Sequence, residues 1–182
     1  GSGPYVYLTG VSVSINGGTH QELIDGQTGF GNPDTTPGAR GIIGGGGFNV
    51  PTTTYRNSIE YVNIASAGNS FDFGDLNVAR YYLSATASRT RAVFSGGQAS
   101  PGLEKTMEFV TIASTGNATD FGEDHANLKR GAAGCGNQTR GLFGSGYTPS
   151  PSFTPNNVIE YITIASTGNA NDFGDLVTRS AQ

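Results

Sequence analysis

Positive charge and cysteine are both scarce in this sequence, and their scarcity excludes several classes of protein. Lysine and arginine together account for 10 of 182 residues, the formal net charge is −4, and no basic residues are clustered. Because binding to a nucleic-acid backbone requires basic groups that neutralise phosphates, we expect no nucleic-acid partner. The single cysteine, Cys135, has no internal disulfide partner, and we expect it to be a small buried hydrophobic residue.

Long apolar runs are absent as well. No run reaches the roughly 20 residues of a membrane-spanning helix, so we expect no membrane insertion. Only 13% of the residues are charged and 35% are hydrophobic, which is low for a helical globular protein. Glycine is abundant instead, with 29 residues, together with serine, threonine and asparagine. Because glycine disfavours helices and the other three favour turns, the composition predicts strands joined by tight turns.

Three motifs recur about every 50 residues, a period typical of stacked repeats and propellers. The first motif is an arginine followed by hydrophobic residues and glycines, and it begins at Arg40, Arg91 and Arg140. The second reads IEYVNIAS, MEFVTIAS and IEYITIAS, and the third reads DFGD or DFGE. The separation of the second and third motifs is constant, whereas that of the first and second varies. The variable connection is therefore expected to be a surface loop.

The residues between the motifs indicate the strands of one repeat. The second motif carries apolar residues on both faces of a strand, as expected for a sheet that lies between two similar sheets. In the middle copy we predict four antiparallel strands at 80–88, 91–97, 106–114 and 120–123, which is the strand content of one β-propeller blade. Gly96 and Gly97 end the second of these strands, where backbones are expected to crowd.

This pattern resembles the kelch repeat, in which an arginine-led strand, a strand ending in a glycine pair, a strand with an aromatic residue and a tryptophan follow one another. The matching residues in the middle copy are Arg80, Gly96, Gly97 and Phe109, and Tyr61 and Tyr161 hold the aromatic position in the other copies. Phe73, Phe121 and Phe173 occupy the tryptophan position, because the chain contains no tryptophan. The third copy has GSG instead of a glycine pair.

The resemblance implies an all-β fold of kelch-like blades with four antiparallel strands each, about three blades per chain. The expected repeats are residues 27–78, 79–127 and 128–182, and residues 1–26 form a separate N-terminal strand or anchor segment. A propeller needs at least four blades. There are three ways to complete the propeller. Two chains could pair into six blades, residues 4–25 could supply an extra blade, or the chain could be part of a longer polypeptide. We favour association with other chains, because an open stack exposes apolar faces.

A narrower resemblance is to kelch-like repeat proteins of tailed bacteriophages, carried by phrases such as YITIASTGNANDFGDL and TRGLFGSG. It implies a non-enzymatic structural or adhesion component of the virion, found in the tail, a fibre or another part of the particle. The implied partners are other copies of the chain, other virion proteins or a glycan on the host surface. A soluble, carbohydrate-binding, lectin-like propeller is the alternative function.

Candidate binding residues lie in the variable loops, where aromatic residues stand beside serine, threonine and asparagine. These candidates are Tyr55, Tyr147 and Phe153. Exposed aromatic residues in such surroundings suit protein and sugar recognition, and packing of the loop itself is an equally good interpretation.

Other motifs have simpler explanations than chemistry. The DFG motif lacks the other kinase motifs, so we expect no enzyme. Its asparagine and aspartate neighbours do not have EF-hand spacing and favour turns, so we expect no metal and no cofactor. We expect the three motif arginines to form ion pairs with the repeated acidic residues and fix the register of the blades, rather than to bind an anion in a channel.

Overall fold

Three similar antiparallel sheets follow one another along the chain. The structure is a computed structural model that describes residues 40–48, 52–123, 128–148 and 154–180, in which every regular element is a strand. The all-β prediction is therefore confirmed. The expected N-terminal segment 1–26 and the candidate Phe153 lie outside the described residues.

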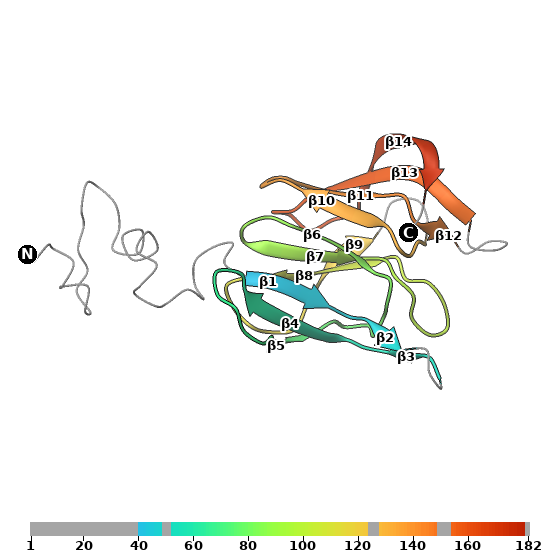
Figure 1. Ribbon diagram of the computed structural model, residues 1–182. Helices are drawn as coiled ribbons and strands as arrows, with labels where there is room; N and C mark the ends of the chain where they lie inside the picture. The colour runs from blue at the N-terminus through green and yellow to red at the C-terminus, as the bar shows by residue number, and fades with distance from the viewer. Residues whose placement is uncertain (1–39, 49–51, 124–127, 149–153, 181–182) are drawn as a thin grey trace, which may run out of the picture.

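The first sheet contains three strands in the order β1 (Arg40–Gly44), β4 (Ser58–Asn63) and β5 (Phe71–Asp75). Between β1 and β4, the chain makes a two-stranded ribbon of β2 (Gly47–Phe48) and β3 (Thr54–Tyr55). This ribbon projects from one end of the sheet, as Figure 1 shows in cyan. It lies in the connection that varies in length between the repeats.

The middle sheet contains four strands in the order β6 (Ser84–Ala87), β7 (Arg91–Ser95), β8 (Thr106–Thr111) and β9 (Thr119–Glu123). These are the four antiparallel strands that the repeat pattern predicts, and the first begins four residues later than expected. Tyr81 still pairs in the same register through an isolated bridge with Gln98, but the ladder is interrupted between Tyr81 and Ser84.

The third sheet has the same core of four strands, namely β10 (Ala133–Gly136), β11 (Arg140–Gly144), β13 (Thr154–Thr163) and β14 (Asn171–Ser180). A short strand, β12 (Tyr147–Thr148), pairs with the beginning of β13. The last two strands are ten residues each, so this sheet extends further than the other two.

In every sheet, the strand of the second motif pairs with the strand of the third motif, and each of these pairings contains the same irregularity, which we call the bulge. The ladder shifts between Ile59 and Glu60, between Met107 and Glu108, and between Ile159 and Glu160. The opposing residues are Gly74, Gly122 and Gly174, whose φ angles of 146°, 141° and 137° favour glycine over residues with a Cβ. The repeat in the sequence is thus a repeat of local backbone geometry.

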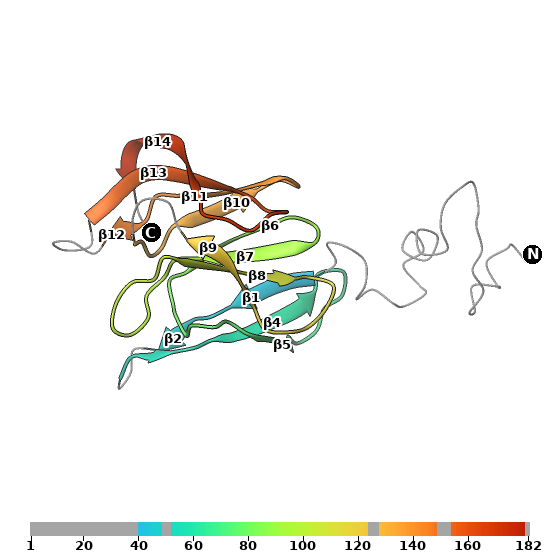
Figure 2. The same cartoon turned by 180° about the vertical axis from the view of Figure 1, so that it is seen from behind.

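The sheets stack face to face, with the middle sheet between the other two (Figures 1 and 2). One apolar core fills the first interface and contains Ile59, Phe73, Ala92, Phe94 and Val110 among its buried residues. A second core fills the next interface and contains Val93, Met107, Phe121, Phe143 and Ile162. Met107 and Val110 of the second-motif strand β8 point into different cores, which explains why such strands carry apolar residues on both faces.

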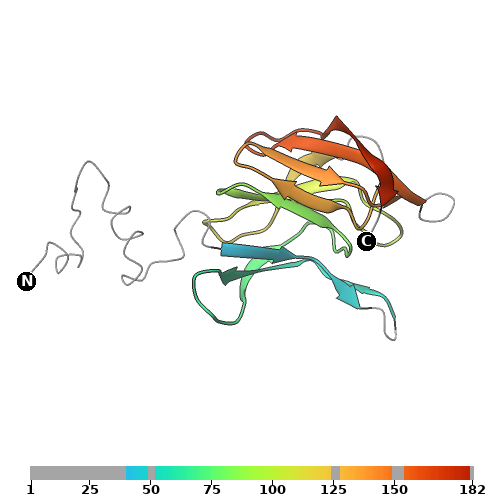
Figure 3. The same ribbon diagram turned by 45° about the horizontal axis from the view of Figure 1, so that its top comes forward.

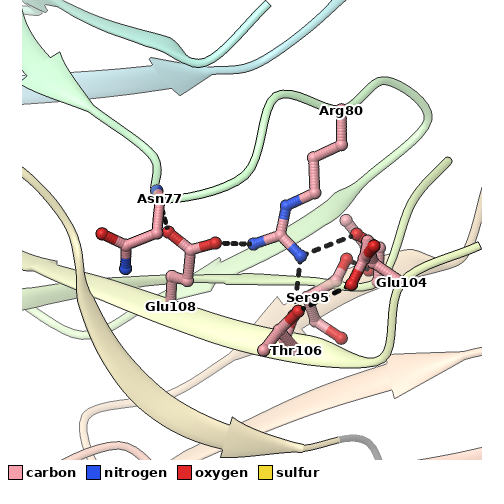
Figure 4. A network of polar contacts seen from close by, with 8 residues as sticks. Asn77, Arg80, Ser95, Glu104, Thr106 and Glu108 are labelled. Atoms are coloured by element: carbon pink, nitrogen blue, oxygen red, sulfur yellow. Dashed lines mark hydrogen bonds and ion pairs between the residues drawn. The ribbon is translucent and has the colours of Figure 1, made fainter. Parts of the chain in front are cut away.

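Each of the last two sheets encloses an ion pair, but its cation is not a motif arginine. Arg80 Nη2 lies 2.9 Å from Glu108 Oε1, and both side chains are buried. Figure 4 shows this pair, together with Thr106, whose backbone oxygen accepts a hydrogen bond from Arg80. Lys129 and Glu160 form the corresponding buried pair in the third sheet. An ion pair therefore repeats in these two sheets, and its cation, Arg80 or Lys129, lies in the segment before the first strand of its sheet.

The three motif arginines instead lie over aromatic rings. The guanidinium carbons of Arg40, Arg91 and Arg140 are 4.5, 4.4 and 4.7 Å from the ring centroids of Tyr61, Phe109 and Tyr161, respectively. The same rings meet Phe73, Phe121 and Phe173 edge to face, at centroid distances of 6.0, 5.9 and 6.0 Å. The expected pairing of these arginines with acidic residues is wrong for the described residues, because Arg80 and Lys129 take the buried glutamates.

Cys135 also differs from its prediction. It is exposed on β10, the edge strand of the third sheet, where it lines a hollow of about 310 Å³ together with Ile42 and Phe94. Its backbone oxygen accepts a 2.7 Å hydrogen bond from Thr86 Oγ1, so the strand is held through its backbone. The prediction that Cys135 is buried rested on the residue type alone, whereas its position on an edge strand leaves the side chain uncovered.

Candidate functional site

A row of aromatic and cationic side chains runs along one side of the stack, from the β2–β3 ribbon to the residues before β6 and β10. This side carries the β2–β3 ribbon and β12, as Figures 1 and 3 show. The rings of Tyr55 and Tyr81 are 5.4 Å apart between centroids, and those of Tyr81 and Tyr82 are 4.4 Å apart. The guanidinium carbon of Arg130 lies 5.3 Å from the ring centroid of Tyr82. We call Tyr55, Tyr81, Tyr82 and Arg130 the tyrosine row.

A cleft of about 280 Å³ lies at the end of the tyrosine row, between the middle and third sheets. Its lining consists of Tyr82, Arg130, Gly131 and Tyr147. Tyr82 is 53% exposed, so about half of its ring surface is open to solvent in the cleft. The cleft therefore offers aromatic surface, phenol hydroxyls and one guanidinium to a ligand that approaches from solvent.

Backbone hydrogen bonds hold the cleft in place. Arg130 and Tyr147 exchange two backbone bonds, of 3.1 and 2.9 Å, and Gly131 N donates to Tyr82 O at 2.8 Å. On the other side of the row, Tyr81 and Gln98 exchange backbone bonds of 3.0 and 2.7 Å. The Gly131–Tyr82 bond joins the middle repeat to the third, and the other bonds lie within one repeat, so the aromatic side chains are presented from a connected backbone rather than from free loops.

Polar side chains complete the row. The Arg130 guanidinium donates a hydrogen bond to Gln98 Oε1, which leaves its flat face against Tyr82. A second cation–ring pair, Arg56 over Phe48 at 4.5 Å, lies in and next to the ribbon. A planar guanidinium can stack on a ring and still donate hydrogen bonds at its edge, which suits recognition of ligands with both apolar and polar faces.

Tyr82 is held in a strained conformation. Its φ angle is 55°, in the left-handed region that costs a residue with a Cβ about 1–2 kcal/mol. The equivalent position of the third repeat is Gly131, with a φ angle of 65°. Such strain is retained at a position where the side chain contributes something else, and it accumulates at functional sites. Tyr82 therefore shares the backbone geometry of the repeat and departs from it in sequence.

Two of the three predicted loop candidates lie on this side of the molecule. Tyr55 is half-buried on β3 within the row, and Tyr147 is half-buried on β12 in the wall of the cleft. Phe153 lies outside the described residues. Sequence reasoning missed Tyr81, Tyr82 and Arg130. The signal for them is a break in the repeat, because RYY at 80–82 aligns with KRG at 129–131.

The asparagines of the two GNA segments have a role that the sequence did not reveal. Asn117 Oδ1 accepts a 3.0 Å hydrogen bond from Asp75 N, and Asn169 Oδ1 accepts one of 3.1 Å from Glu123 N. These bonds join neighbouring sheets rather than closing a local turn. Within the described ranges, no three histidine, cysteine or acidic residues are grouped as a metal site would require.

Comparison with known proteins leaves the fold and the cleft as the main guides to function. No protein-family model matches the chain, and no curated protein matches it. No helix in the described parts of the chain has the length and apolar character needed to cross a membrane.

Proposed function

We propose that the chain is a non-enzymatic structural or adhesion component of a phage particle, built of kelch-like propeller blades, that binds a partner through the tyrosine row and its cleft. The observation that carries the binding role is the row itself, a continuous set of ring and guanidinium contacts along one side of the stack. Exposed tyrosines and arginines on a rigid scaffold lose little conformational entropy on binding, which is why they are enriched in recognition surfaces.

The propeller arrangement is supported by the shared architecture of the sheets. The middle and third sheets each have a core of four antiparallel strands, and all three stack on apolar faces in one register. Radial repetition of such sheets is how propellers protect their strand edges. Membership in a virion is supported by the resemblance of the repeat phrases to proteins of tailed phages.

The partner is either a protein or a glycan on the host surface. Carbohydrate binding has a specific observation in its favour, because a tyrosine ring can stack on the C–H face of a sugar while hydroxyls and a guanidinium bind its hydroxyl groups. The cleft offers Tyr82, Tyr147 and Arg130 in this combination. A soluble lectin is therefore the second candidate function.

Binding to a glycan array and to intact host cells tests both candidates. We expect the native chain to bind host cells and Tyr82→Ala or Tyr147→Ala to reduce this binding about tenfold or more. The control is Phe71→Ala, because Phe71 is also an exposed aromatic residue but lies on β5 outside the row. Retention of binding to purified glycans would favour the lectin, whereas binding to cells alone would favour a protein receptor.

Equal binding by the native chain and both tyrosine variants would contradict the proposed role of the row. Placement in a virion has a separate test, which is mass spectrometry of purified phage particles from the source culture. Peptides of this chain are expected in those particles, and their absence would contradict that part of the proposal.

A further inference from the structure

The two ends of the stack have apolar faces with no described sheet against them. On the first sheet, Ile43 and Ile64 are more than half exposed. On the third sheet, Phe173 is 50% exposed and lies beside the half-buried Tyr161. We call these surfaces the leading face, on the first sheet, and the trailing face, on the third sheet.

The two interfaces inside the chain use one set of hydrogen bonds. In the first interface, Gly116 N donates to Phe73 O at 2.7 Å and Ala118 N donates to Asp75 O at 2.8 Å. In the second, Gly168 N donates to Phe121 O at 2.7 Å and Ala170 N donates to Glu123 O at 2.9 Å. The asparagine bonds from Asn117 and Asn169 complete each set.

A motif arginine spans each interface as well. Arg40 Nη1 donates to Ile112 O at 2.9 Å, across the first interface. Arg91 Nη1 donates to Ile164 O at 3.2 Å and to Ala165 O at 2.9 Å, across the second. Each arginine also lies over the aromatic ring of its own sheet, so the ring fixes its direction.

The leading and trailing faces carry the two halves of this same set. The leading face has Gly68, Asn69 and Ser70 in the positions of Gly116, Asn117 and Ala118, and Ile64 in the position of Ile112. The trailing face has Phe173 and Asp175 in the positions of Phe121 and Glu123. Arg140 stacks on Tyr161 as the other two motif arginines stack on their rings.

The glycines opposite the bulge show the same difference between the internal interfaces and the trailing face. A Cβ on Gly74 would collide with the backbone oxygen of Gly116, and one on Gly122 would collide with that of Gly168. At Gly174 a Cβ would meet nothing within 4 Å, although its φ angle of 137° matches the other two. Gly174 on the trailing face thus keeps the backbone conformation that, at Gly74 and Gly122, leaves room for the backbone of the neighbouring sheet.

We propose that the trailing face of one copy binds the leading face of a second copy in the register of the two internal interfaces. Phe173 O and Asp175 O accept from the Gly68 and Ser70 amides of the second copy, and Asp175 N donates to the second copy's Asn69. Arg140 donates to the Ile64 carbonyl of the second copy. A second copy fits because it carries the complementary half of the set, whereas an unrelated partner would have to supply all of these groups independently.

This contact joins two different faces, so it forms a ring if the rotation closes and a filament if it does not. Propellers close with about four to eight blades, and six is the multiple of three sheets within that range. Two copies are therefore the expected closed form. The number of copies rests on the propeller arrangement proposed above, whereas the face-to-face contact follows from the internal interfaces alone.

Light scattering coupled to size-exclusion chromatography tests the contact on the native chain. We expect a mass of about 38 kDa, twice the 18.8 kDa of one chain. Phe173→Asp on the trailing face and Ile64→Asp on the leading face should each give the mass of one chain. Tyr82→Ala is the control, because Tyr82 is exposed to a similar degree but lies on neither face, and it should leave the dimer intact.

Mixing the two face variants distinguishes the proposed contact from a symmetric one. Each variant keeps one functional face, so a mixture regains one intact contact and associates, whereas a contact between two leading faces or two trailing faces would be broken by only one variant. Far-ultraviolet circular dichroism shows whether each variant is folded, and the trailing-face variant Arg140→Ala, which should raise the dissociation constant about tenfold, replaces Phe173→Asp if that variant is not.

A native mass of one chain at all soluble concentrations would overturn the proposal, as would a dimer that neither face variant dissociates. A larger assembly that both variants dissociate would support the contact and overturn closure with two copies. Ligand binding in the tyrosine cleft and association through the faces are measured separately, so either can fail without the other.

Discussion

The middle sheet and the third sheet share one strand architecture in different surroundings. Both have a core of four antiparallel strands, the same bulge, and a buried glutamate paired with a cation from the preceding loop. Among the described residues, the middle sheet is covered on both faces and the third sheet on one. Their differences therefore measure what a neighbouring sheet contributes, separately from what the strands themselves contribute.

The largest expected difference concerns the phenylalanines of the third motif. Phe121→Ala removes a buried ring from the second core and should cost about 3–5 kcal/mol of unfolding free energy, including the cavity. Phe173→Ala removes a half-exposed ring and should cost about 1 kcal/mol. Urea unfolding, at a protein concentration at which the mass is that of one chain, measures both. Equal costs would show that the third sheet is covered by residues not described here.

The next comparison concerns the glutamates of the second motif. Glu108→Gln removes the charge that balances buried Arg80 and should cost about 3 kcal/mol, near the lower limit for a broken buried pair, because Arg80 keeps its bonds to Gly96 O and Thr106 O. Glu60→Gln should cost less than about 1 kcal/mol, because Glu60 is only half-buried and accepts from Ser70 Oγ. A similar loss from both variants in urea unfolding would be inconsistent with this account.

A smaller difference is expected at the glycines opposite the bulge. Gly122→Ala and Gly174→Ala both place a Cβ in the left-handed region, at a cost of about 1–2 kcal/mol. Gly122→Ala should cost about 1 kcal/mol more, because its Cβ also meets the backbone of the third sheet. The two thermal unfolding midpoints give the comparison, and an equal decrease would mean that the sheets can move apart to accept the methyl group.

The smallest expected effect is a stabilisation. Ser145 has a φ angle of 68° where the other repeats have Gly45 and Gly96 at 70° and 63°, and its buried Oγ has no hydrogen-bond partner among the described residues. Ser145→Gly should raise stability by about 1 kcal/mol, or the unfolding midpoint by about 2–4 °C. The reverse change, Gly96→Ser, should lower it. A decrease for Ser145→Gly would indicate a role for the hydroxyl.

Much of the sheet structure could be predicted because it depends on neighbours along the chain. The four strands of the middle repeat follow from alternation and from the glycines that end them. The buried ion pairs could not be predicted in the same way, because Arg80 meets Glu108 only after the strands between them have paired. The tyrosine row is harder still, since Tyr55 and Arg130 belong to different repeats and meet the row through the stacking of sheets.

By itself, the sequence determined the repeat, the strands and the presence of apolar residues on both faces of each sheet. Only the tertiary structure decided which of those faces are covered. Phe73, Phe121 and Phe173 occupy one position in three copies of one motif, yet they are 2%, 2% and 50% exposed. The physical reason is that burial is a property of what lies next to a side chain in space, and identical local sequences can have different neighbours.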